Sequence, residues 1–150
     1  MKDFLIDLFD YHHLLNQKLA DQFIEHSDKI SERSIFLFIH SQIAQQIWND
    51  RILGKKTELQ ENYGMEKFKE INDSNYSDSL KILNEFDLAK KISYRNSKGI
   101  DFENSVQEIL FHAANHFSHH RGQIVFDLRE SGIEPIMTDY IYYKKIKPAF

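Results

Sequence analysis

A group of histidines inside one amphipathic segment limits what this chain can fold into more than any other feature. Four of its eight histidines fall within residues 112–120. On a helix of about 100° per residue the apolar residues of this segment share one broad arc; they are Val106, Ile109, Leu110, Ala113, Phe117, Ile124 and Leu128. Residues four apart lie on one helix face, so His116 and His120 can direct their imidazoles to one point. We expect that point to face the core, where the pair would supply half of a metal site.

The rest of such a site has to come from another segment, and His40 is the best candidate. It lies four residues after Phe36 and three before Ile43, which predicts a position on the buried side of its helix. Three histidine nitrogens, with one position left for water or substrate, are typical of catalytic metal sites. A lone histidine on an apolar face is, however, more often a hydrogen-bonded core residue, and an H-x-x-x-H pair also arises by chance. Spacing alone leaves both interpretations open.

Other residues of possible chemical interest have plainer interpretations. His112 would be a hydrogen-bonding neighbour of the site or a substitute ligand, whereas His119 points away from the apolar arc and is expected in solvent. Arg121 is expected to face outward or to pair with a carboxylate. His12 and His13 are expected to be partly exposed near the surface of the bundle.

Composition narrows the class of protein. With 150 residues, 41% of them hydrophobic, the chain is expected to form one domain over residues 1–150. It has no cysteine, so any metal would be held by nitrogen and oxygen. The net charge of −4 leaves no basic footprint, which argues against nucleic acid as a partner. No apolar run is long enough for a membrane span and the N-terminus is no signal peptide, so we expect a cytoplasmic protein.

Hydrophobic periodicity predicts long helices. The expected helices span residues 3–26, 31–53, from 77 or 79 to 88, and 105–130. Ser31 and a capping box of Ser105 and Glu108 mark two of the starts. Gly54 and Gly132 mark the corresponding ends.

Three further segments connect or follow these helices. Polar residues dominate residues 55–76, which predicts a long connection with a short helix at most around residues 65–71. Residues 91–103 alternate apolar and polar around a turn and predict a β-hairpin. The aromatic tail at residues 137–143 is too apolar to hang free and is expected to pack along the bundle. Together these elements define an all-α fold, a four-helix bundle with a small β-hairpin before the last helix.

The histidine segment also resembles a known protein family. Residues Leu110–Ile124, with the core Asn-His-x-x-x-His-Arg-Gly-Gln, are similar to the signature helix of the DinB-like family. The match extends to Phe38–His40, followed by Trp48 and Arg51–Gly54, and to the hairpin and the tail around Pro135–Tyr142. The resemblance covers nearly the whole chain, and the core of the motif is fairly specific.

This resemblance implies a four-helix bundle that holds a divalent metal through His40, His116 and His120, in agreement with the spacing. The implied metal is Zn or Ni, with Fe or Mn as further options. Better-understood relatives are metal-dependent enzymes that use a low-molecular-weight thiol, as S-transferases or as an isomerase, and many are homodimers. The resemblance therefore implies an enzyme acting on a small molecule, without identifying catalytic or thiol-binding residues.

Two functions remain open at this point. The first is a thiol S-transferase, in which a bound metal lowers the pKa of the thiol and its open position faces a cleft near residues 55–76. The alternative is a non-catalytic metal-binding or stress-associated interaction protein, in which the histidines join two helices. An open fourth position in a substrate-sized cleft would favour the enzyme, and a closed ligand shell would favour the alternative.

Overall fold

The computed structural model describes residues 1–59, 63–96 and 98–146. In chain order the elements are helices α1 (Lys2–Glu25) and α2 (Glu32–Leu53), the 3-10 turn η1 (Met65–Lys67), helix α3 (Phe68–Glu85), strands β1 (Lys91–Arg95) and β2 (Asp101–Ser105), and helices α4 (Val106–Glu130) and α5 (Tyr140–Ile146). The expected all-α bundle with a hairpin directly before α4 is confirmed. Ser97, in the expected hairpin turn, lies outside the described residues.

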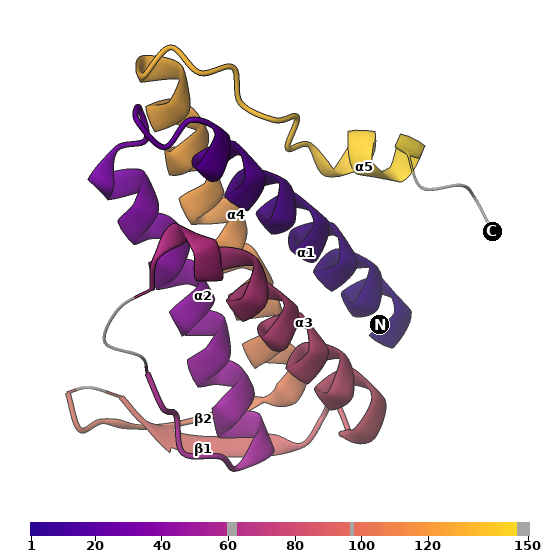
Figure 1. The fold of residues 1–150 in the computed structure, drawn as a ribbon. Helices are drawn as coiled ribbons and strands as arrows, with labels where there is room; N and C mark the ends of the chain where they lie inside the picture. Colours follow the sequence, from indigo (N-terminus) through magenta and orange to yellow (C-terminus); the bar gives the residue numbers. More distant parts are fainter. Residues whose placement is uncertain (60–62, 97, 147–150) are drawn as a thin grey trace.

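The four long helices pack along one another, with the hairpin across one end of the bundle (Figure 1). Helices α3 and α4 lie between α1 and α2, and each of them packs against both. The pairing of α2 with α4 matters most for the site, because it brings His40 opposite the histidine segment. No helix in the described part of the chain is long and apolar enough to cross a membrane.

The helix ends follow the expected local signals. The Ser31 side chain caps α2 by accepting a hydrogen bond from the Ser34 N–H at 3.0 Å, and Gly54 ends the helix with φ 70°. At the start of α4, the Ser105 hydroxyl accepts from the Glu108 N–H at 3.3 Å, and the Glu108 carboxylate accepts from the Ser105 N–H at 2.6 Å. Both predicted caps are confirmed, and they set where the two site-bearing helices begin.

Two apolar clusters form the ends of the core, and a polar layer separates them. The cluster toward the hairpin includes Leu5, Phe9, Ile52, Ile82 and Leu110. The cluster at the opposite end includes Phe23, Phe38, Phe68, Ile124 and Leu128. Between them all four long helices contribute buried polar side chains: His12, Asn16, Gln42, Gln45, Asn49, Asn72, Asn75, Ser79 and Arg121. Hydrogen bonding inside the bundle therefore stabilises its middle.

This polar layer explains the one helix that the sequence misplaced. The start of α3 at Phe68 corrects the expected start at Ser77 or Ser79 and shortens the expected connection over residues 55–76. The side of α3 that faces α2 carries Asn75 and Ser79, so its apolar periodicity is weak. Buried amide and hydroxyl groups take the place of apolar residues there; the Gln45 amide, for example, donates to Ser79 Oγ at 2.9 Å.

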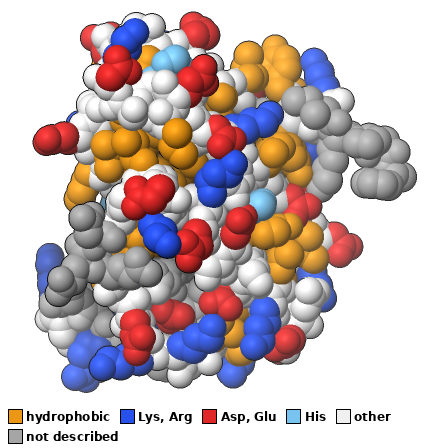
Figure 2. Space-filling view, viewed as in Figure 1, with side chains coloured by type: hydrophobic (Ala, Val, Ile, Leu, Met, Phe, Trp, Pro, Cys, Tyr) orange, Lys and Arg blue, Asp and Glu red, His pale blue; other side chains and the backbone are white. Residues whose placement is uncertain are grey.

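The hairpin and the tail match expectation. Strands β1 and β2 pair antiparallel, with Tyr94 opposite Phe102. The tail packs on α1, where the Tyr11 hydroxyl donates to the Thr138 carbonyl and Tyr143 is buried. It also forms the short helix α5, which the sequence analysis did not predict. Over the face shown in Figure 2, acidic and basic side chains are interspersed.

Candidate metal centre

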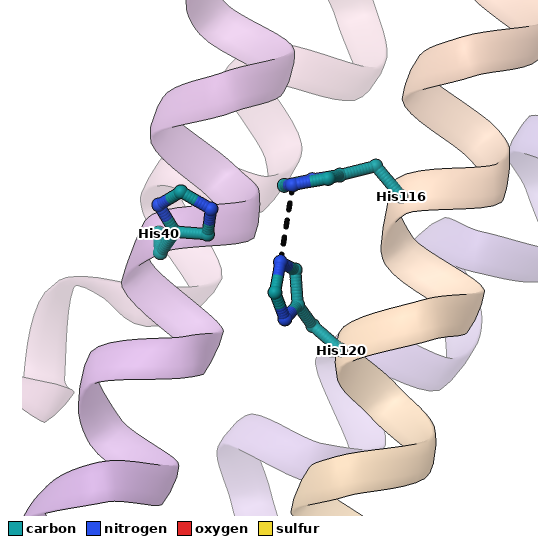
Figure 3. Close-up of side chains that lie close together, drawn as sticks. All are labelled: His40, His116 and His120. Atoms are coloured by element: carbon teal, nitrogen blue, oxygen red, sulfur yellow. Dashed lines mark hydrogen bonds between the residues drawn. The ribbon is translucent and has the colours of Figure 1, made fainter.

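Three histidines from two helices converge at the seam between α2 and α4. His116 and His120 lie one turn apart on α4, and His40 faces them from α2 (Figure 3). Each offers one ring nitrogen, and the three nitrogens lie within 4.8 Å of one another. The i, i+4 spacing accounts for the pair on α4, and the packing of α2 against α4 accounts for His40.

The distances suit a small divalent ion with nitrogen ligands. His116 Nε2 and His120 Nε2 are 3.1 Å apart, and the His40 ring centroid is 5.0 Å and 4.9 Å from those of His116 and His120. Two nitrogens bound to one zinc ion at about 2.1 Å are about 3.4 Å apart in a tetrahedral site. The pair on α4 therefore already has ligand spacing, and the His40 nitrogen lies within 4.8 Å of both.

Gln123 orients one of these histidines. Its amide oxygen is 2.7 Å from His120 Nδ1, and an amide oxygen can only accept, so Nδ1 carries the hydrogen. The lone pair of His120 is then on Nε2, directed at His116 Nε2, which donates the hydrogen of their shared contact. A metal cation bound between the two rings would take the place of that hydrogen. In the sequence Gln123 stands out only as part of the family motif, and its i+3 spacing from His120 is the local signal for this contact.

Two of the three histidines, His116 and His40, are held in the neutral form that binds metals. Burial, with a smaller contribution from the neighbouring His120 and His40, lowers the pKa of His116 to about 4. Desolvation of the ring, followed by the influence of His120, also lowers the pKa of His40, although His40 is exposed overall. Neutral imidazole is the metal-binding form of histidine, so near neutral pH these rings need not lose a proton to bind an ion.

The position of the site corrects the expectation that it faces the core. His116 and His120 are half-buried and His40 is exposed, so the three rings line a seam that opens to solvent. On α2 the neighbours Leu37 and Phe38 take the buried positions, at 7% and 1% exposure, whereas Phe36 is 65% exposed. The stripe of Phe36 and His40 therefore lies on the flank of α2, and His40 is open to solvent.

Comparison with protein families accords with this geometry. The model of the DinB family matches residues 17–148. The chain belongs to the DinB family. A search among curated proteins found no significant match.

The remaining histidines of this DinB-family chain are outside the three-residue cluster. His112 is exposed, with its ring centroid 5.9 Å from that of His116. His119 is exposed and His13 half-exposed, as predicted. The prediction for His12 was wrong, because its side chain is 1% exposed and lies inside the bundle.

Arg121 also departs from expectation, since it does not face outward and pairs with no carboxylate among the described residues. It is 4% exposed, and its Nη2 lies 2.6 Å from His12 Nδ1, which accepts the hydrogen bond. Burial lowers the pKa of Arg121 to about 10, and burial with the adjacent Arg121 charge holds the pKa of His12 well below its usual value. Arg121 follows His120 directly, so this contact ties the site-bearing turn of α4 to α1.

The cleft near residues 55–76 is not lined by any of the three histidines. It lies between α2 and α3, lined by residues that include Asp50, Lys55, Asn75 and Asp78. The expectation that the open metal position faces this cleft was therefore wrong. Because α2 presents His40 to α4 and Asp50 to α3, the two features lie on different sides of the same helix.

Proposed function

We propose that this DinB-family protein binds one divalent metal ion through His40, His116 and His120 and is a metal-dependent enzyme of the thiol S-transferase type. One observation carries the proposal: the three nitrogens lie within 4.8 Å of one another, on two helices, at a seam open to solvent. A purely structural site would be expected to close its ligand shell with a fourth protein group. Among the described residues, only these three form such a cluster.

The donor set limits the choice of metal. Three imidazoles suit Zn or Ni, and Fe or Mn also accept them, whereas a soft thiolate-selected metal is disfavoured. When bound, such an ion supplies Lewis acidity that lowers the pKa of a coordinated thiol or water. The chain itself has no cysteine, so the thiol must come from a low-molecular-weight co-substrate.

The chain's own residues would position and shield this chemistry. Gln123 fixes the tautomer of His120 through the 2.7 Å contact at Nδ1. The packing of Arg121 against His12 holds the same turn of α4 in place. Homodimerisation and a cytoplasmic location are part of the proposal, and sedimentation equilibrium of the purified chain tests the first.

The first experiment is the metal content of untagged protein prepared without chelator or nickel resin. We expect about one divalent ion per chain in the wild type, lost in His116→Ala and retained in the matched control His119→Ala, which removes an exposed neighbour. If the wild type and the His119→Ala control both lack metal, and zinc or nickel leaves the melting temperature of the wild type unchanged, the proposal fails.

A second experiment separates the enzyme from the non-catalytic alternative. Cobalt-substituted protein is titrated with glutathione, and a sulfur-to-cobalt charge-transfer band shows that a thiol has taken the open position. Such a band supports the S-transferase type. If metal binds stoichiometrically and no band appears with glutathione or 2-mercaptoethanol, the metal-binding interaction protein is the better description.

A further inference from the structure

A small pocket adjoins the histidine cluster where α2, the hairpin and α4 meet. It has a volume of about 180 Å³ and is lined by Trp48, Tyr94, Asn104, Glu108, Ile109 and His112. We call it the Trp48 pocket. A cavity of about 150 Å³ is enough to hold a benzene ring. The Trp48 pocket therefore has room for one six-membered ring and little more.

Three aromatic rings form its walls. The Trp48 ring meets Tyr94 edge to face, with centroids 5.1 Å apart, and meets His112 in the same manner at 5.3 Å. The Tyr94 hydroxyl donates to Asn104 Oδ1 at 2.8 Å, which holds that wall in place. Ile109, at 2% exposure, adds apolar surface. A planar ring can make stacked or edge contacts on several sides here.

The charges around the Trp48 pocket favour an anionic ligand. The Arg51 guanidinium lies 4.5 Å from the centre of the Trp48 ring and 4.7 Å from that of Tyr94, and no carboxylate among the described residues forms an ion pair with it. The Glu108 carboxylate, by contrast, accepts from the Ser105 N–H and lies 3.5 Å from Lys91 Nζ. Glu108, which lines the pocket, thus already has a hydrogen-bond donor and a nearby lysine. Arg51 does not line the pocket but stacks on two of its rings, and it has no acid partner among the described residues, so it can take the acidic group of a bound ligand.

His112 joins this pocket to the metal centre. Its ring contacts Trp48 on one side, and on the other its centroid is 5.9 Å from that of His116. A ring bound in the Trp48 pocket is therefore within reach of the seam through a short side arm. The aromatic pocket, an arginine without an acid partner among the described residues and the three-histidine cluster thus lie next to one another on one side of the bundle.

We propose that the Trp48 pocket binds the aromatic ring of a small acidic molecule and that Arg51 contacts its acidic group. The arm of that molecule would carry its reactive group to His40, His116 and His120; this second part rests on the proposed function. The substrate class is accordingly an aromatic acid with a thiol or electrophilic arm.

Trp48 makes the test direct, because it is the only tryptophan of the chain. Benzoate is titrated while its fluorescence is recorded, with cyclohexanecarboxylate as an acid without an aromatic ring and benzyl alcohol as a ring without charge. We expect saturable binding of benzoate in the millimolar range, as suits so small a ligand, and weaker binding of the other two. If none of the three compounds binds, or if all three bind equally, the inference is overturned.

Paired variants locate the contacts, with affinity measured by calorimetry. Tyr94→Leu should weaken benzoate binding roughly three- to tenfold while Tyr94→Phe, which keeps the ring, retains it. Arg51→Met should weaken it while Arg51→Lys retains most of it. Phe126→Leu, at an exposed aromatic residue elsewhere on α4, is the control and should change nothing. Melting curves show that each variant is folded.

The link to the metal is tested with 4-(mercaptomethyl)benzoate. Zinc should strengthen its binding by at least roughly tenfold and leave benzoate unaffected, and His116→Ala should abolish the gain. Stoichiometric zinc without benzoate binding would overturn the pocket and leave the proposed function intact. Benzoate binding without any metal uptake would overturn the proposed function and the proposal that the side arm reaches a metal. The proposal that the Trp48 pocket binds an aromatic acid would stand.

Discussion

Gln123 shows how a residue that cannot bind the metal itself can decide whether a histidine does. Its amide oxygen holds the hydrogen of His120 on Nδ1 and so leaves the lone pair on Nε2, directed at His116 across the seam. Without this contact the imidazole can rotate and change tautomer, and both changes oppose metal binding.

Replacing Gln123 by leucine should therefore weaken metal binding without unfolding the protein. We expect a roughly 10- to 100-fold loss of zinc affinity, measured by competition with a chromophoric chelator, and a metal-free melting temperature close to that of the wild type. Gln107→Leu, an exposed glutamine of the same helix, is the matched control. Equal zinc affinity in the two variants would show that His120 needs no such support.

His12 is the other residue whose environment has a measurable consequence. In the folded protein its pKa is held well below the usual value, first by burial and then by Arg121. The unfolded chain takes up a proton near pH 6.5 and the folded chain does not, so this residue adds stability above about pH 6.5 that is lost as the pH falls.

The expected result is a steeper loss of stability below pH 6.5 in the wild type than in His12→Gln. In metal-free protein, urea unfolding curves give the free energy of unfolding at each pH. Its slope against pH should differ between the two proteins by up to about 1.4 kcal/mol per pH unit, which corresponds to the uptake of one proton on unfolding. Glutamine keeps an oxygen that can accept from Arg121, so the variant is expected to fold. Parallel pH profiles for the two proteins would contradict the buried, neutral state of His12.

Among the elements, α3 depends most on polar contacts for its place in the bundle. The Asn75 amide donates to the Gln42 carbonyl at 2.9 Å and contacts Gln42 Oε1 at 3.2 Å, and the Asn75 carbonyl accepts from the Asn49 amide at 2.9 Å. These groups are buried, so removing one partner leaves another unsatisfied.

Asn75→Ala should accordingly destabilise the protein by about 1–3 kcal/mol in urea unfolding. Ser74→Ala, at the exposed neighbouring position, should stay within about 0.5 kcal/mol of the wild type. If Asn75→Ala were as stable as the control, the polar layer would contribute nothing to holding α3 against α2.

For the whole molecule, the consequence of the site is that a bound metal joins α2 to α4. A ligand that binds only the folded state stabilises it by about 2.7 kcal/mol at a hundredfold excess over its dissociation constant. Since about 1 kcal/mol shifts the melting temperature of a chain of this size by roughly 2–4 °C, saturating zinc should raise it by roughly 5–10 °C.

This rise should disappear on adding EDTA and be absent from His40→Ala, because that variant removes the ligand supplied by α2. His112→Ala, which lies outside the cluster, should keep it. Differential scanning calorimetry measures all three proteins. A full zinc response in His40→Ala would mean that α4 alone binds the ion and that the two helices are not joined.

The sequence by itself determined the features that depend on near neighbours. The spacing of His116 and His120, the caps at Ser31 and Ser105, and the hairpin follow from contacts a few residues apart, and each is found in the structure. These features obey the fixed geometry of a helix turn or a strand pair, whatever surrounds them.

Only the tertiary structure decided the features that depend on distant packing. The flank position of His40, the start of α3 at Phe68 and the contact of Arg121 with His12, 109 residues away in the chain, had no local signal. For α3 and Arg121 the buried surface is polar, because a partner helix supplies the hydrogen bonds. For His40 the apolar neighbour Phe36 is itself exposed, so apolar spacing did not mark the buried face. Hydrophobic periodicity does not detect such a partner, so the sequence could name His40 as a candidate ligand, but only the packing of α2 against α4 placed it on the flank beside His116 and His120.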